Sequence, residues 1–251
     1  TPIEVAGSLQ ELLDRELGFV VAAERNDQNP DLFASILKAG HHLLAEKPLG
    51  RTAADARQVV EAAKSADRQL SVFYTNRFNP MVAQARDLVH AGALGTLHSL
   101  EFRVLTTQVR FRDPDHWLFH RQVAGGGMLS WLGCHYLDLI AFLAGDEIAS
   151  VAAEIATRGD DGIDVEDTAT LSMRMRSGAL ASLHAAYVLA ISGGGFYNAA
   201  GYDQYAGVYG REGRLWWDDH GPPELHLESR AAEFSAAPSR TFTFTPAESR
   251  A

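Results

Sequence analysis

The chain has 251 residues, a length that accommodates one large domain or two small ones and suffices to bury a sizeable core. Apolar residues make up 46% and charged residues 22%, proportions that argue against a disordered or collagen-like chain. The formal net charge of −10 repels phosphate backbones at long range, so we expect no nucleic-acid partner. The single cysteine, Cys134, cannot form an internal disulfide, which favours a reducing, cytoplasmic compartment.

Apolar runs along the chain are short. The strongest, residues 18–23 and 137–144, have the length of core segments, whereas a membrane-spanning helix needs about 20 apolar residues. The N-terminal residues do not resemble a signal peptide. We therefore expect no membrane partner.

The first part of the chain begins with a buried strand and a helix. Residues 18–23 form a continuous apolar run that predicts the strand. Asn29 and Pro30 predict the start of the helix, with Asn29 as its cap, and Gly40 predicts its end.

The alternation of strand and helix continues from there. Residues 42–46 predict a second strand, and residues 52–66 predict a helix that starts with a pattern similar to a capping box. Residues 69–74 predict a third strand, and residues 79–92 predict a further helix, capped by the asparagine of an Asn-Pro pair. Such alternation is typical of a parallel α/β layer.

The second part of the chain has a different pattern. Residues 97–107 predict a long strand, and residues 127–144 predict one strong helix. Residues 168–175 and 179–186 alternate apolar and polar side chains around a turn, which predicts antiparallel sheet. We therefore place a boundary near Leu97, giving domains 1–96 and 97–251.

The Glu46-Lys47-Pro48 motif follows the second predicted strand directly. Open α/β sheets bind ligands at the carboxyl ends of their strands, so Lys47 is placed to approach a substrate hydroxyl or a cofactor ribose. The alternative is a solvated Glu-Lys pair in a turn.

A second candidate site lies on the helix that follows three glycines, Gly125–Gly127. Trp131, His135 and Asp138 are three and four residues apart and so share one helix face. An imidazole beside a carboxylate can transfer protons. The alternative is a hydrogen-bonded core histidine with a surface aspartate. The packed stripe comprises Leu129, Leu132, Tyr136, Leu139 and Leu143.

Other motifs give weaker signals. The glycine triplet is a poor match to a phosphate-binding loop, because no strand precedes it directly. His116 and His120 have a spacing that suits a metal, but no cysteine or carboxylate-rich context supports one, so we predict no metal site. Residues 192–198 resemble a flexible, aromatic-bearing loop.

Several of these motifs together resemble the Gfo/Idh/MocA oxidoreductase family. They are Glu46-Lys47-Pro48, Asn76-Arg77-Phe78-Asn79-Pro80, Gly92-Ala-Leu-Gly95, and the segment from Gly125 to His135 and Asp138. The resemblance implies a partial Rossmann-like parallel α/β layer that binds NAD or NADP. It further implies a following α+β domain with a large, mostly antiparallel sheet, a sugar, cyclitol or polyol substrate, and a homo-oligomer.

The resemblance also implies roles for particular residues. Lys47 and His135 are the candidate catalytic residues: His135 takes the hydroxyl proton while Lys47 polarises the oxygen. Candidate cofactor contacts are Glu46, Lys47, Pro48 and Asn76. Candidate substrate contacts are Arg77, Trp131, Asp138 and Tyr197.

The chain departs from the family pattern at three places. Trp131 stands where the family usually has an aspartate, and Trp117-Leu118 replaces a frequent Trp-Arg pair. The Gly-x-Gly-x-x-Gly segment of the family is absent. Its loss would expose the edge of the strand at Phe19–Val21, so we expect an incomplete record of a longer enzyme rather than a natural short form. Alternative functions are a non-catalytic sugar-binding or assembly protein, and a lyase with tightly held NAD.

Overall fold

The structure is a computed structural model, and it describes residues 3–107, 109, 112–187 and 202–245. The chain forms two compact units. The first unit combines the residues up to Tyr74 with His120–Gly125, and the second combines Thr75–Phe119 with the residues from Gly126 on. The boundary near Leu97 stays a prediction, and the compact units as such divide after Tyr74.

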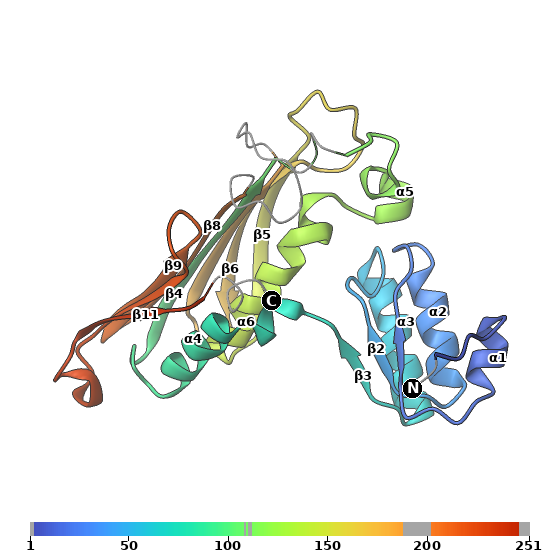
Figure 1. The fold of residues 1–251 in the computed structure, drawn as a ribbon. Coiled ribbons are helices and arrows are strands. Elements are labelled where there is room, and N and C mark those ends of the chain that lie inside the picture. Colours follow the sequence, from blue (N-terminus) through green and yellow to red (C-terminus); the bar gives the residue numbers. More distant parts are fainter. Residues whose placement is uncertain (1–2, 108, 110–111, 188–201, 246–251) are drawn as a thin grey trace. The chain divides into compact units, whose positions relative to one another are not determined.

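The first unit is built on a small parallel sheet (Figure 1). Its three strands lie in the order β1-β2-β3, with Val21 beside Leu44 and Leu44 beside Ser71. The elements of this unit are α1 (Leu9–Leu13), β1 (Val20–Ala22), α2 (Asn29–Lys38), β2 (Leu43–Ala45), α3 (Ala53–Ala66), β3 (Leu70–Val72) and α5 (Arg121–Ala124). Helices α2 and α3 pack against each other, and α2 packs on β1 and β2.

Helix starts in the first unit agree with the sequence at one place and differ at another. The capping box before α3 is confirmed: the Asp55 N–H donates to Thr52 Oγ1 (3.1 Å), and Asp55 Oδ2 accepts from the Thr52 N–H (3.2 Å). The prediction that Asn29 caps α2 is wrong, because Gln28 occupies the cap position. The Asn29 side chain instead bonds to Glu24 and Pro48, outside the helix.

The second unit contains an eight-stranded sheet in the order β11-β10-β9-β8-β4-β7-β6-β5. Only β4 and β7 pair in parallel, and the other neighbours are antiparallel. The strands are β4 (Leu97–Thr106), β5 (Ile148–Ala156), β6 (Thr168–Met175), β7 (Leu180–Ala186), β8 (Tyr202–Gly210), β9 (Gly213–Asp218), β10 (Glu224–Ser229) and β11 (Ser239–Thr243). A small parallel layer followed by a large, mostly antiparallel sheet confirms the predicted fold class.

Helices cover one face of this sheet (Figure 1). The helical elements are η1 (Thr75–Phe78), α4 (Pro80–His90), η3 (Trp117–Phe119), the π-helical turn η4 (Leu129–Gly133), α6 (Cys134–Ala144) and η6 (Ala232–Phe234). Alternate residues of β6, among them Leu171 and Met173, point into the core beneath these helices. The predicted stripe on α6 is also in this core, where Tyr136, Leu139 and Leu143 are buried.

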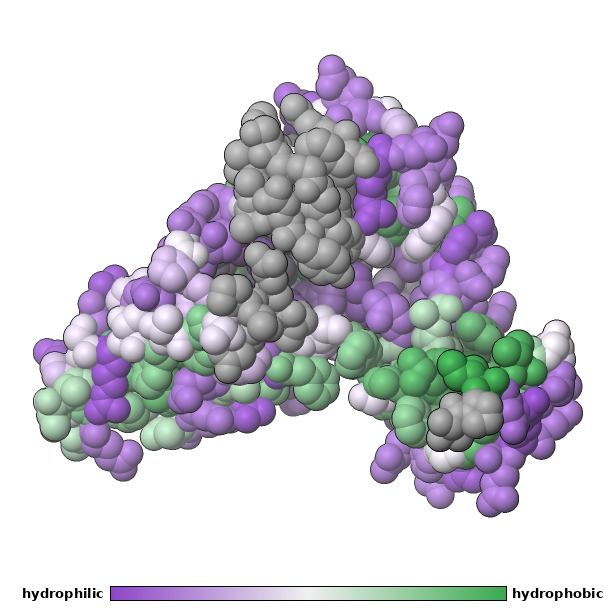
Figure 2. Space-filling view, in the orientation of Figure 1, coloured by the Kyte–Doolittle hydropathy of each residue, from purple (hydrophilic) through white to green (hydrophobic). Residues whose placement is uncertain are grey.

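Large apolar side chains are exposed on the first unit, where Figure 2 shows a hydrophobic area. Phe19 is 61% exposed and Val21, on strand β1, is 65% exposed. The neighbours of Val21 along the strand, Val20 and Ala22, are buried on the helix-covered side. The strand is therefore apolar on both faces, a pattern typical of a strand that is covered on both sides.

One helical stretch, Arg121–Ala144, is long and apolar enough to cross a membrane by length and composition. The stretch is interrupted at the glycine triplet, because α5 ends at Gly125, which has a left-handed conformation, and helix resumes at Met128. Leu139, Ile140 and Leu143 of this stretch are buried in the core of the second unit, so they pack as a core helix does.

Candidate functional site

Lys47 lies at the carboxyl end of β2, in the first unit. The Glu46 N–H donates to the Ala22 carbonyl (2.9 Å), which continues the pairing of β1 and β2 to this point. Lys47 is only 7% exposed, which is unusual for a lysine and means that its side chain is largely removed from bulk water. The interpretation of Lys47 as part of a solvated pair does not fit this burial.

The residues around Lys47 fix the end of the strand. Asn29 links two loops: its Oδ1 accepts from the Glu24 N–H (3.0 Å), and its Nδ2 donates to the Pro48 carbonyl (3.1 Å). Burial raises the pKa of Glu46 above its ordinary value, although the Lys47 charge works in the opposite direction. At the carboxyl ends of β1 and β2 a buried lysine thus follows a carboxyl group that is partly desolvated.

The segment His120–Gly125 belongs to the first unit and is held there by two side chains. Asn26, which is buried, donates to the Ala124 carbonyl (2.8 Å), and Arg51 Nη1 donates to the Gln122 carbonyl (2.7 Å). A Cβ on Gly125 would lie 2.5 Å from the Cβ of Arg51, so only glycine fits there.

His135 lies in the second unit, near the start of α6 and directly after the π-helical turn η4. Single π-turns within helices are frequent at functional sites. The Arg112 guanidinium carbon is 5.4 Å from the centre of the Trp131 ring in that turn, a cation–π contact. Cys134 is partly buried, and its Sγ donates to the Ser130 carbonyl (3.2 Å).

The start of this helix is occupied by a carboxylate from a remote part of the chain. Glu166 Oε1 accepts from the Leu129 N–H (3.1 Å), and the Glu166 carbonyl accepts from the Met128 N–H (3.1 Å). A Cβ on Gly127 would lie 2.0 Å from that carbonyl oxygen. The glycines therefore make room for Glu166, which fills the place that a bound phosphate would take.

Asn76, Arg77 and Asp138 also belong to the second unit. Arg77 Nε and Nη2 donate to the two oxygens of Asp138 at 2.7 and 2.5 Å, and the Asp138 side chain is only 8% exposed. The geometry is that of a bidentate ion pair. Asp138, which shares the helix with His135, thus pairs with Arg77 of η1.

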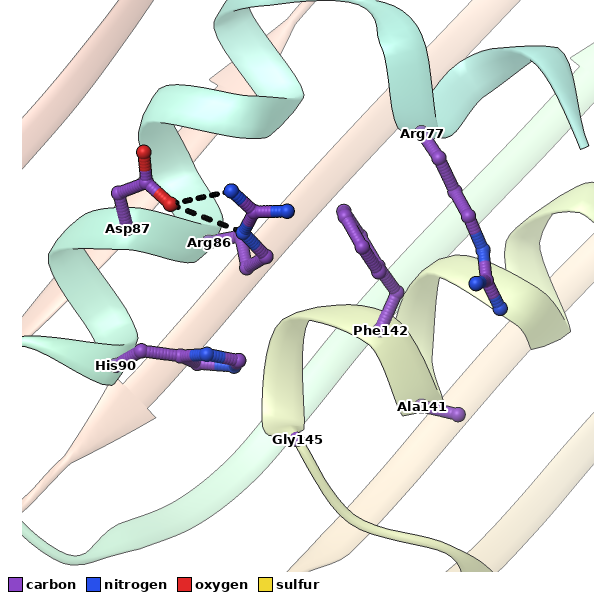
Figure 3. Close-up of a pocket in the computed structure, with 7 residues that line it drawn as sticks. All are labelled: Arg77, Arg86, Asp87, His90, Ala141, Phe142 and Gly145. Carbon is purple, nitrogen blue, oxygen red and sulfur yellow. Dashed lines mark hydrogen bonds and ion pairs between the residues drawn. The ribbon is translucent and has the colours of Figure 1, made fainter.

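A groove of about 570 Å³ lies between α4 and α6 (Figure 3). Phe142 stands between two guanidinium groups, with the Arg77 carbon 5.0 Å and the Arg86 carbon 5.1 Å from its ring centre. Arg86 is in turn paired with Asp87. Both arginines are thus held by carboxylates and by the ring, a set of contacts that joins the two helices.

His116 and His120, whose spacing alone would suit a metal, are not in the one group of metal-ligating side chains found among the described residues. His116 lies against the rings of Trp117 and Phe119, and burial lowers its pKa. The metal-like group that the described residues do contain is Asp203, Asp219 and His220. There the Arg103 guanidinium donates to Asp203 (2.8 Å). Its positive charge balances the Asp203 carboxylate, as a bound cation would.

The structure gathers the candidate residues into two sets. Lys47, with Glu46 and Pro48, is in the first unit, and the other described candidates are in the second. Tyr197 lies outside the described residues. The sequence did not indicate the contact of Arg112 with Trp131 or that of Glu166 with Leu129. The one available signal was that Glu166 shortly precedes the alternating pattern of β6, which is consistent with a buried position.

Comparison with known proteins agrees with this architecture. A model of the oxidoreductase family with an NAD-binding Rossmann fold matches residues 1–74, and a model of the GFO/IDH/MocA C-terminal domain matches residues 82–216. The chain belongs to the GFO/IDH/MocA family of oxidoreductases.

Two curated relatives that the chain resembles are dehydrogenases. The chain is 27% identical over 241 residues to levoglucosan dehydrogenase of Pseudarthrobacter phenanthrenivorans, covering 85% of this chain and 58% of the relative. It is 29% identical over 211 residues to myo-inositol 2-dehydrogenase of Thermotoga maritima, covering 82% and 58%. The crystal structure of an oxidoreductase domain protein from Kribbella flavida is 27% identical, with a TM-score of 0.78 over 93% of this chain and 64% of that one. The chain thus spans about 58% of the length of these two curated relatives.

Proposed function

We propose that the chain is part of an oxidoreductase that transfers a hydride between NAD or NADP and a sugar, cyclitol or related polyol. The observation that carries the proposal is the buried Lys47 at the carboxyl end of β2, in the segment that the NAD-binding family model matches. The relatives named above act on levoglucosan and myo-inositol, which supports a hydroxyl-bearing substrate.

The residues present fit one part of a dinucleotide site. The carboxyl ends of a parallel sheet are where such cofactors bind, and Glu46, Lys47 and Pro48 lie there, with Asn76 as a further candidate contact. The sequence contains no Gly-x-Gly-x-x-Gly turn for the pyrophosphate. When bound, the nicotinamide supplies the hydride acceptor or donor.

The side chains have distinct tasks in the reaction. As the carbinol C–H bond breaks, the hydroxyl proton passes to His135, because an imidazole can act as a general base near neutral pH. The Lys47 ammonium group stabilises the negative charge that develops on the oxygen. Arg77, Trp131, Asp138 and Tyr197 are the proposed substrate contacts. Trp131 offers a ring face on which a sugar can stack.

The test is direct. Purified chain is titrated with NADH and NADPH by nicotinamide fluorescence and then assayed with levoglucosan and myo-inositol. We expect Lys47→Ala and His135→Ala to lower kcat about 10²- to 10⁴-fold, while the exposed controls Lys64→Ala and His98→Ala leave it unchanged. Full activity in both site variants would contradict the assigned roles. Sugar binding without any nucleotide binding would favour a sugar-binding protein instead.

We further propose a cytoplasmic homo-oligomer without nucleic-acid or membrane partners. The net charge of −10 and the lone cysteine support this proposal. Light scattering after size-exclusion chromatography tests the oligomer, and a monomeric mass would contradict it.

A further inference from the structure

Two adjacent carboxylates, Glu166 and Asp167, are buried just before β6. Glu166 is 5% exposed and Asp167 is 1% exposed. Carboxylates are rarely buried so deeply unless hydrogen bonds compensate for the lost water. Each of the two has such bonds, but they go to different parts of the fold.

Asp167 serves the sheet. Its Oδ2 accepts from the main-chain N–H groups of Arg158 (2.7 Å) and Gly159 (2.5 Å), which follow β5. Its own main chain bonds to Ala156 and Tyr187, at the ends of β5 and β7. Asp167 therefore fixes the strand ends.

Glu166 serves the helix that carries His135. Its side chain and its carbonyl together accept the N–H groups of Leu129 and Met128, two of the amides that a helix start leaves without partners. Its negative charge also lies at the positive end of the helix dipole. At Gly127 the helix start and the segment that contains Glu166 approach so closely that no side chain fits between them.

His135 is thus placed by attachments on both sides of it. The helical segment is continuous from Leu129 to His135, so fixing the main chain at Leu129 also fixes the main chain at His135. The next residue, Tyr136, is buried and donates its hydroxyl to Gln204 of β8. The helix is tied to the sheet by Tyr136 and to the chain before β6 by Glu166.

We infer that Glu166 is a positioning residue for His135: its carboxylate holds the helix start so that the imidazole is set for proton transfer. The inference rests on the proposed function of His135. It assigns a role to a buried acid that takes no part in the chemistry itself.

The experiment compares Glu166→Ala and Glu166→Gln with the matched control Asp167→Ala, each in the full chain. Two readouts need no turnover: amide hydrogen exchange at Leu129, and the NMR titration of the His135 imidazole. We expect Glu166→Ala to speed exchange at Leu129 at least about tenfold and to move the His135 titration midpoint. Glu166→Gln keeps an acceptor oxygen and restores both values towards the native ones.

Asp167→Ala separates positioning from general destabilisation. We expect it to lower the unfolding midpoint but to leave Leu129 exchange and the His135 titration as they are. Equal changes in the two alanine variants, or an unchanged His135 in Glu166→Ala, would overturn the inference. If Glu166→Ala does not fold, Glu166→Asp, which shortens the side chain, gives the same comparison.

Turnover distinguishes the inference from the function on which it rests. If the full chain oxidises a polyol, Glu166→Ala should lower kcat more than it changes KM. If the chain shows no turnover while both NMR readouts change as expected, the placement of His135 by Glu166 stands and the proposed function fails.

Discussion

Helices α4 and α6 pack against each other, yet α4 and the helical segment that leads through η4 into α6 begin in different ways. Helix α4 starts on a cap two residues away, where Asn79 Oδ1 accepts from the Met81 N–H (2.9 Å). The helix of His135 starts on Glu166, 37 residues beyond Leu129. A local cap, from a residue next to the helix start, stabilises the helix but does not attach it to the rest of the protein. A remote cap, from a distant part of the chain, also fixes the position of the helix in the fold. The remote cap belongs to the helix with the candidate catalytic residue.

The largest effect should come from closing the space at the remote cap. In Gly127→Ala the new methyl group would collide with the Glu166 carbonyl, so either the helix start or the segment that contains Glu166 must move. We expect a loss of about 3 kcal/mol in the free energy of unfolding, measured by denaturant titration. Gly221→Ala is the control, because a Cβ there meets nothing within 4 Å. Equal stability of the two variants would show that the close approach is unimportant.

A smaller effect is expected at the local cap. Asn79→Ala removes the acceptor for the Met81 N–H and should cost about 1 kcal/mol in the same denaturant titration. Asn79→Asp keeps the acceptor and should stay near the native value. The His135 titration should not change in either variant. A change there would mean that the two helix starts are not independent, contrary to the comparison.

The smallest effect concerns the ion pair between Arg77 of η1, which precedes α4, and Asp138 of α6. Arg77 is 44% exposed and pairs with the buried Asp138, so solvent screens one partner only. A double-mutant cycle with Arg77→Ala and Asp138→Ala should give a coupling of about 0.5 kcal/mol that falls as salt is raised. Zero coupling at low salt would show that Phe142, rather than Asp138, holds Arg77.

The fold was predictable where its signals are local. The Thr52 and Asn79 caps, the turn at residues 176–178 and the alternation of β6 each lie within a few residues of the element that they define. The prediction for Asn29 was wrong because its side chain bonds to Glu24 and Pro48 and not to the helix. The Asn-Pro pattern at the helix start does not indicate these two bonds.

The candidate site was predictable only in part. The positions of Lys47 and His135 follow from a strand end and a helix pattern, and the burial of Lys47 agrees with that strand end. The π-turn, the Arg112 contact with Trp131 and the role of Glu166 depend on segments far apart in the chain. Spacing alone holds no information on such contacts, so the structure was needed to find them.

The segment His120–Gly125 has a consequence for anyone who divides the molecule. The chain passes from one compact unit to the other at three points, so neither unit is a single continuous stretch. A gene fragment that ends at Tyr74 would lack the acceptors of the buried Asn26 amide and of Arg51. A separate version of the first unit should therefore carry residues 120–125, joined by a linker or by circular permutation.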